Sequence, residues 1–143
     1  MDAGEARAFA ERYTGAWCSG DPALVARRYA PDGSLTINEG TPSIGSEEIT
    51  AAAKAFMDAF PDLTVVFDGL RDGPNGWAYR WTLDGTHAET GNHVRVSGHK
   101  LWQLGYGVIQ SSRGQYDQAE YDRQVSAAGS DARYARRARN CAA

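Results

Sequence analysis

The hydrophobic pattern of this chain changes its period after residue 60, and that change limits the fold more than any other feature. The aromatic residues Phe9, Tyr13 and Trp17 recur every four positions, which predicts a helix with one apolar stripe. A similar stripe begins after Ser46, a favourable N-cap, and stops at a proline. From residue 63 on, apolar residues alternate at every second position, as in half-buried strands. The expected helices are residues 5–18, 22–29, 46–60 and 118–127.

The alternating part of the chain predicts a curved sheet. Short turns separate its strands, so consecutive strands are expected to pair antiparallel. Helices come first and strands follow, which is typical of an α+β domain. We expect a cone-shaped, mostly antiparallel sheet wrapped around three N-terminal helices, with an apolar interior. The expected strands are residues 34–38, 63–70, 77–87, 93–104 and 108–117.

The length of 143 residues predicts a single domain, which we place at residues 1–128. The remaining segment, 129–143, contains four arginines but no apolar period. Such a segment has no face to bury, so we expect an Arg-rich, disordered tail.

Composition and charge exclude several classes of partner. A net charge of −3 favours neither nucleic acid nor an anionic membrane. No run approaches the roughly 18 apolar residues of a membrane span. Of the two cysteines, Cys141 lies in the expected tail, so we predict no structural disulfide and a cytoplasmic location. No Cys/His spacing suggests a metal, and we expect no cofactor.

Four tryptophans and seven tyrosines are more than a minimal core needs. Those on the inward faces would meet inside the cone. They either line a pocket for a flat, apolar ligand or fill a bulky core, and the sequence leaves both open. The residues expected to contact a ligand are Trp17, Phe56, Phe60, Tyr79, Trp81, Lys100, Trp102 and Tyr116.

Four stretches carry a family resemblance: ERYTGAWCSGDPALVARRYAPDGSL, IGSEEITAAAKAFMDAFPDLTV, YRWTLDGTH and GVIQSSRGQYDQAEYDRQ. They resemble the SnoaL-like polyketide cyclase group of the nuclear transport factor 2-like superfamily, over about residues 5–126. The resemblance implies the cone fold. It implies no single reaction, because the superfamily includes cyclases, ketosteroid isomerase, epoxide hydrolases, dehydratases and non-enzymatic binding modules.

The resemblance also implies which catalytic positions are kept. Tyr13 matches a helical tyrosine that, in ketosteroid isomerase, donates to the developing enolate oxygen. Ile37 occupies the position of the isomerase's general base, and Trp102 that of a donor or histidine in the third long strand. The family's acid/base aspartate follows an arginine on the last strand, where this chain has Arg113 and Gly114. The family's aspartate and histidine are therefore replaced.

Two further residues are candidates for acid/base chemistry. Asp117 either caps the last helix, as the capping-box order D-Q-A-E suggests, or acts as an acid/base. His99 and Lys100 are adjacent, so only one of them faces the cone. Alternation from Trp102 turns Lys100 inward, whereas a bulge at Gly98 would turn His99 inward as a base. The candidate catalytic residues are Tyr13, His99 and Asp117.

Two functions fit this pattern. One is a cofactor-independent enzyme that cyclises, isomerises or hydrates a hydrophobic, polyketide- or terpenoid-like molecule; the other is a non-catalytic binding module of the same fold. The tyrosine and the aromatic lining favour the enzyme, whereas the missing aspartate favours the binding module. We also expect a homodimer through the outer face of the sheet, with Val94, Val96 and His99 on that face.

Overall fold

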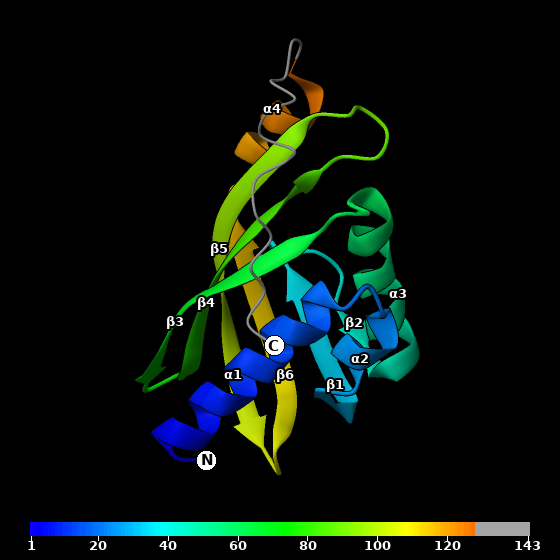
Figure 1. Ribbon diagram of the computed structural model, residues 1–143. Helices are drawn as coiled ribbons and strands as arrows, with labels where there is room; N and C mark the ends of the chain where they lie inside the picture. The colour runs from blue at the N-terminus through cyan, green and yellow to red at the C-terminus, as the bar shows by residue number, and fades with distance from the viewer. Residues whose placement is uncertain (128–143) are drawn as a thin grey trace.

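Three helices lie against the inner side of a curved sheet in the computed structural model, which describes residues 1–127 (Figure 1). The prediction of a disordered tail at 129–143 falls outside the described residues. So does Cys141, and with it the prediction that the two cysteines do not pair.

The four predicted helices are present, with some ends displaced. The second is shorter than predicted, because the chain enters a strand at Tyr29. The third begins without a serine cap: Ile44 occupies the N-cap position, and Glu48 Oε1 accepts a hydrogen bond from its backbone N–H at 2.9 Å. The helices are α1 (Ala3–Cys18), α2 (Pro22–Ala26), α3 (Gly45–Ala59) and α4 (Gln118–Ser126).

The sheet has six strands in the order β2-β1-β6-β5-β4-β3. The last four strands of the chain form the predicted antiparallel meander, and β1 pairs parallel with β6. The predicted α+β class with a curved, mostly antiparallel sheet is thus confirmed. Two features differ from the prediction: the expected turn at 30–34 belongs to the first strand, and β2 lies in an expected loop. The strands are β1 (Tyr29–Ile37), β2 (Ser43–Ile44), β3 (Thr64–Gly73), β4 (Gly76–Thr86), β5 (His93–Gly105) and β6 (Val108–Tyr116).

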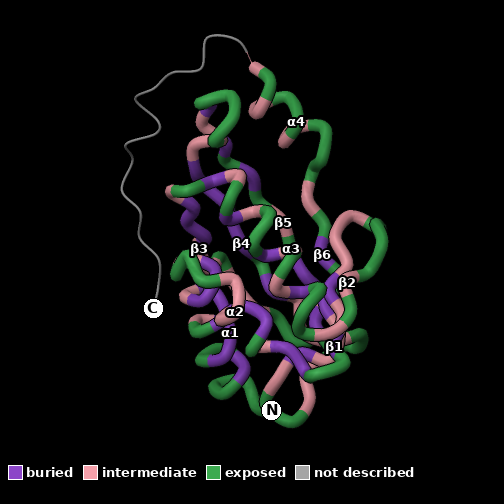
Figure 2. The backbone as a smooth tube through the Cα atoms, turned by 90° about the vertical axis from the view of Figure 1, so that its right-hand side faces the viewer, coloured by how far each residue is buried: buried purple, intermediate pink, exposed green. Residues whose placement is uncertain are grey.

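Alternation along β5 decides which side chains enter the core. β5 runs in unbroken register with β4, so every second residue from Trp102 back to Val94 lies on the inner face. Val94 and Val96 are accordingly buried, and their predicted place on the outer face is wrong. Figure 2 shows this burial along the central strands and α1, with exposed backbone at the turns.

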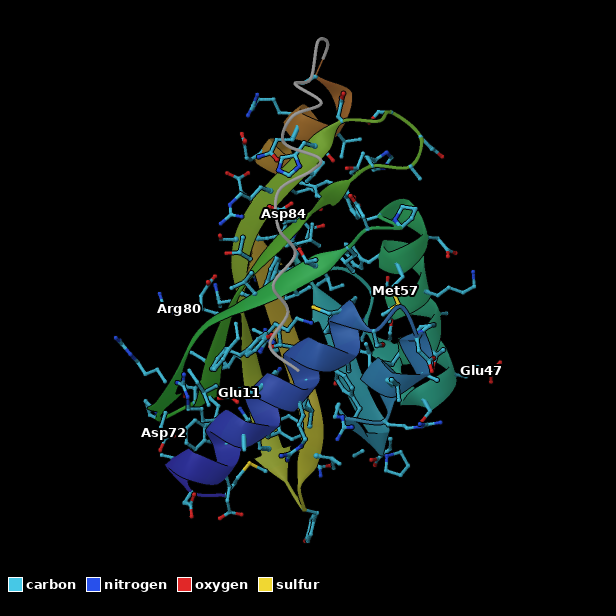
Figure 3. All side chains as sticks on the ribbon, in the orientation of Figure 1. Glu11, Glu47, Met57, Asp72, Arg80 and Asp84 are labelled. Atoms are coloured by element: carbon cyan, nitrogen blue, oxygen red, sulfur yellow. The ribbon has the colours of Figure 1, made fainter. Side chains whose placement is uncertain are left out.

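The outer face of the sheet is polar. Arg80 and His99 are opposite one another on β4 and β5, and both are exposed. Figure 3 shows Arg80 extending away from the molecule, on the side remote from α3. The same face carries buried polar groups: Thr82 Oγ1 hydrogen-bonds to Asp68 and Ser97.

α4 is held at one end of the sheet by polar contacts with β5 and the residue before it. Asn92 Nδ2 donates to the carbonyl oxygens of Val125 and Ala127, both at 2.7 Å. The side-chain amide of Gln124 accepts a hydrogen bond from the Arg95 backbone N–H and donates one to the Arg95 carbonyl oxygen. At its start, α4 also lies close to the ends of β1 and β6: Asn38 Nδ2 donates to Gln118 Oε1, and the Tyr121 ring packs against Tyr116.

Candidate functional site

A pocket lies between the helices and the inner face of the sheet. Its walls are almost entirely apolar or aromatic. Lys100 is the one Lys, Arg, His, Asp or Glu side chain among its lining residues. Half-buried residues from β1, α3, β6 and α4 form the rim. A flat, apolar molecule is the class of ligand that such a lining accommodates. The lining consists of Tyr13, Trp17, Ile37, Phe56, Val65, Tyr79, Trp81, Leu83, Val96, Lys100, Gly114, Tyr116 and Tyr121.

Lys100 lies on the inner face of β5 and is only 7% exposed. Its Nζ donates a hydrogen bond to Tyr13 Oη at 2.6 Å, and lies 5.1 Å from the ring centroids of both Tyr13 and Trp17. Removal from water disfavours the charged ammonium form, and this burial lowers the pKa of Lys100 to about 7. A substantial fraction of the side chain is therefore a neutral amine near neutral pH.

Tyr13 connects Lys100 to a second buried tyrosine. Its hydroxyl is 3.0 Å from Tyr29 Oη, and either oxygen can be the donor. Burial, followed by the proximity of Tyr29, raises the pKa of Tyr13 well above its usual value. Burial likewise raises the pKa of Tyr29 to about 12. Both phenols thus remain protonated, so the Tyr13 hydroxyl is able to donate a hydrogen bond.

Gly114 adjoins Lys100 across the sheet. The two residues are directly paired between β5 and β6, and both line the pocket. A Cβ atom added at Gly114 would lie 3.4 Å from Lys100 Cγ and no closer to any other group, which is ordinary van der Waals contact. The residue that matches the family's acid/base aspartate therefore lies beside the amine, and its lack of a side chain leaves that amine without a carboxylate there.

A second glycine shapes the wall. A Cβ atom at Gly98 would come within 2.5 Å of Trp81 Cζ2, so the indole ring lies directly over this residue. Only glycine permits that close approach. The indole ring of Trp81 can therefore lie flat over Gly98 and form one wall of the pocket. Trp81 Nε1 is buried and has no hydrogen-bond partner within residues 1–127.

Six of the eight residues predicted to contact a ligand line the pocket: Trp17, Phe56, Tyr79, Trp81, Lys100 and Tyr116. Phe60 and Trp102 are not among the lining residues. Trp102 stacks on Tyr79 with ring centroids 4.5 Å apart and is fully buried behind it. Phe60 packs edge-on against His87 and Tyr121, also without exposure. Both point inward as predicted but lie in the core rather than at the pocket surface.

The three predicted catalytic residues lie in different places. Tyr13 is in the pocket. His99 is exposed on the outer face, because no bulge occurs at Gly98 and the regular alternation of β5 turns it away. Asp117 is also exposed and is the N-cap of α4, where its Oδ1 accepts from the Glu120 N–H at 3.0 Å. The geometry thus unites Tyr13 with Lys100 and leaves His99 and Asp117 outside the pocket.

Several lining residues were not predicted. Leu83 and Val96 share the inner face with residues that were, so the alternation of β4 and β5 contained the signal. Val65 is a buried strand residue of the same kind. Tyr121 reaches the pocket only because α4 is held against β5, a contact for which the sequence gives no local signal.

No group of three His, Cys, Asp or Glu side chains within residues 1–127 is arranged to hold a metal ion. In the same part of the chain, no helix is long and apolar enough to cross a membrane.

The fold is that of the ketosteroid isomerase-like, or nuclear transport factor 2-like, proteins. A protein of this fold from Catenulispora acidiphila, in complex with trimethylamine, superposes with a TM-score of 0.76 at 16% identity, over 88% of this chain and 95% of that one. A nuclear transport factor 2-like protein of unknown function from Burkholderia pseudomallei gives a TM-score of 0.75 at 17% identity, over 89% and 100%. TerC, co-crystallised with polyporic acid, gives 0.74 at 10% identity, over 86% and 99%.

Within this fold, the sequence matches the family model described as SnoaL-like polyketide cyclase over residues 7–125. The match spans most of the chain, so the protein belongs to the SnoaL-like polyketide cyclase family. Among curated proteins, none is significantly similar in sequence.

Proposed function

We propose that this chain is a cofactor-independent enzyme that cyclises, isomerises or hydrates a hydrophobic, carbonyl-containing small molecule of polyketide- or terpenoid-like character. The single observation that carries the proposal is the Lys100–Tyr13 pair, 2.6 Å apart in an otherwise apolar pocket. Membership of the family and the small molecules bound by proteins of the same fold support it.

Lys100 and Tyr13 have complementary roles in this proposal. The neutral amine of Lys100 removes a proton next to the substrate carbonyl, as general bases do in enolate chemistry. If Tyr29 donates to Tyr13, the Tyr13 hydrogen is free to bond the developing enolate oxygen. The flat aromatic walls hold the substrate so that the reacting carbons approach each other. Proton removal by lysine takes the place of the carboxylate that Gly114 lacks.

The test is turnover of a panel of polycyclic ketones by wild-type protein and three variants. Lys100→Met and Tyr13→Phe keep the bulk of each side chain and remove its polar group. Each should lower the rate by about 10²-fold or more, the usual contribution of a positioned acid or base. His99→Gln, on the exposed outer face, is the matched control and should be fully active. Full activity of Lys100→Met would contradict the proposal.

A binding module is the second candidate, and the glycine at 114 favours it, since the family's acid/base carboxylate is missing. In that case the same ketones should bind and quench the fluorescence of Trp17 and Trp81, which line the pocket, yet be recovered unchanged. Tyr13→Phe would then alter affinity only.

We also propose a homodimer formed through the outer face of the sheet. α1 to α3 pack on the inner side, so the outer side of β4 to β6 is the sheet surface available to a second copy (Figure 1). An interface of this kind buries on the order of 1,200–2,000 Å². Sedimentation velocity should give a dimer at micromolar concentration, and a strict monomer would contradict this proposal.

A further inference from the structure

Lysine is rare in this chain, and its placement is selective. Of the 15 Lys and Arg residues, only Lys54 and Lys100 are lysines. Lys54 lies on the exposed side of α3 and pairs with Asp58 at 2.5 Å. Lys100 is the buried one. Arginine is always charged and is not a nucleophile, whereas a buried lysine becomes a neutral, nucleophilic amine.

The surroundings of Lys100 suit a nucleophile better than a structural cation. A buried ammonium is normally paired with a carboxylate, because an unpaired charge is costly in an apolar site. The pocket lining contains no Asp, Glu or His. The polar group that contacts Nζ is Tyr13 Oη, a phenol that burial keeps protonated. A neutral amine beside a proton donor, under flat aromatic walls, is a site for a carbonyl carbon.

The glycine at position 114 helps keep the Lys100 amine in its neutral form. A Cβ atom there would make only ordinary contacts, the nearest 3.4 Å from Lys100 Cγ, so an aspartate at 114 would begin beside the lysine side chain. Its carboxylate would pair with Lys100 and hold it as an ammonium, which has no lone pair for attack. The glycine is thus compatible with covalent chemistry at Lys100, and an aspartate is not.

We propose that Lys100 is a nucleophile that forms an imine with the carbonyl carbon of an apolar aldehyde or ketone bound in the pocket, with Tyr13 as the proton shuttle. This inference rests on the proposed function for the identity of the pocket and the class of ligand. It assigns Lys100 a covalent role in place of, or before, simple proton removal.

The step balances with water as the only other product. The Nζ lone pair attacks the carbonyl carbon, a C–N bond forms, and the carbonyl oxygen takes the Tyr13 proton while Tyr13 recovers one from nitrogen. The C–O bond of this carbinolamine then breaks, and the oxygen leaves as water with a second proton from Tyr13. The nitrogen lone pair forms the C=N bond, and the last N–H proton returns to Tyr13. No oxidant or reductant takes part.

The test uses 2-naphthaldehyde as the probe, with borohydride to reduce any imine to a stable amine. Wild-type protein at pH 7 should gain one naphthylmethyl group, located by peptide mapping at Lys100 rather than at Lys54 or the N-terminus. Lys54→Arg should label as the wild type does, and Lys100→Met should lose the adduct. Labelling of Lys54 or the N-terminus at a rate equal to or above that of Lys100 in the wild type would overturn the proposal, and this comparison needs no variant to fold.

A matched pair at position 114 sharpens the test. Gly114→Asp should slow labelling of Lys100 at pH 7 by about 5-fold or more, because a carboxylate nearby raises a lysine pKa by one unit or more and so lowers the neutral fraction of the amine. Gly114→Asn adds a side chain of nearly the same shape without charge and should slow labelling much less. Equal slowing by both variants would mean obstruction of the pocket, and would overturn the argument that the glycine keeps the amine neutral.

The outcomes separate this inference from the proposed function. Ketone turnover that requires Lys100 without any adduct would leave the acid/base enzyme standing and remove the imine. A Lys100 adduct without turnover of any ketone would support the imine and remove the proposed reaction.

Discussion

Lys100 and Asp84 are both ionisable, both nearly inaccessible to water, and on opposite faces of the same sheet. On the outer face, Asp84 Oδ2 lies 2.9 Å from Arg95 Nη1, with which it forms an ion pair, and Asp84 Oδ1 lies 3.6 Å from His93 Nε2. On the inner face, Lys100 contacts a phenol and two aromatic rings. Equal burial therefore occurs in two different settings: the outer carboxylate is ion-paired with Arg95, whereas burial in an apolar setting lowers the pKa of the inner amine to about 7.

The largest expected change in stability is that of Lys100→Met, which removes the buried amine from the inner face. Because the folded state lowers the pKa of Lys100 from 10.5 to about 7, it binds fewer protons than the unfolded chain between those values. Stability should therefore fall as the pH is lowered from 10.5 to 7, and the loss should be complete below 7.

Methionine has no ionisable group, so the variant should be more stable than the wild type by on the order of 5 kcal/mol at pH 6. That gain should shrink to nothing by pH 10.5. Urea unfolding at pH 6 and at pH 9.5 measures it, and a gain that does not depend on pH would mean that Lys100 is not desolvated.

A smaller effect is expected on the outer face. Asp84→Ala removes the acceptor of a charge-assisted hydrogen bond from Arg95 and should cost about 1.5–3 kcal/mol of unfolding free energy. Asp84→Asn keeps an acceptor in place and should cost less. A change of less than about 0.5 kcal/mol in the unfolding free energy of Asp84→Ala is typical of a neutral surface site. That result would mean that the Asp84–Arg95 pair does not stabilise the outer face.

The smallest effect concerns Asp117, which belongs to neither buried environment. Because Asp117 is the N-cap of α4, its replacement by alanine should lower the unfolding free energy by about 0.5–2 kcal/mol. Replacement by asparagine should cost less, because asparagine accepts the same hydrogen bond from the Glu120 N–H. Thermal melts of both variants measure this. Loss of turnover in Asp117→Asn with an unchanged melt would instead make Asp117 an acid/base and place the reactive centre outside the pocket.

The sequence predicted the fold well because its signals are local. The four-residue spacing of Phe9, Tyr13 and Trp17 reflects one buried helix face, and two-residue alternation reflects one buried strand face. The same alternation placed Lys100 inside, and applied consistently it would also have placed Val94 and Val96 there.

The site was harder to predict because it depends on depth and register. Trp102 and Trp81 both point inward, yet one is behind Tyr79 and the other is at the pocket wall, a difference of packing depth that alternation does not encode. The pairing of Lys100 with Gly114 depends on the turn between β5 and β6 and on an irregularity near Gln103. A shift of one residue in that register would have separated the two.

Gly114 also bears on how such a chain changes over generations. Some glycine codons become aspartate codons through a single base change, so a pocket with a free amine and a pocket with an ion pair are adjacent in sequence space. A Cβ atom at this position would meet no group closer than 3.4 Å, so the first atom of a side chain fits without displacing its neighbours. A lineage carrying Lys100 can therefore exchange one kind of chemistry for the other by a single inherited substitution.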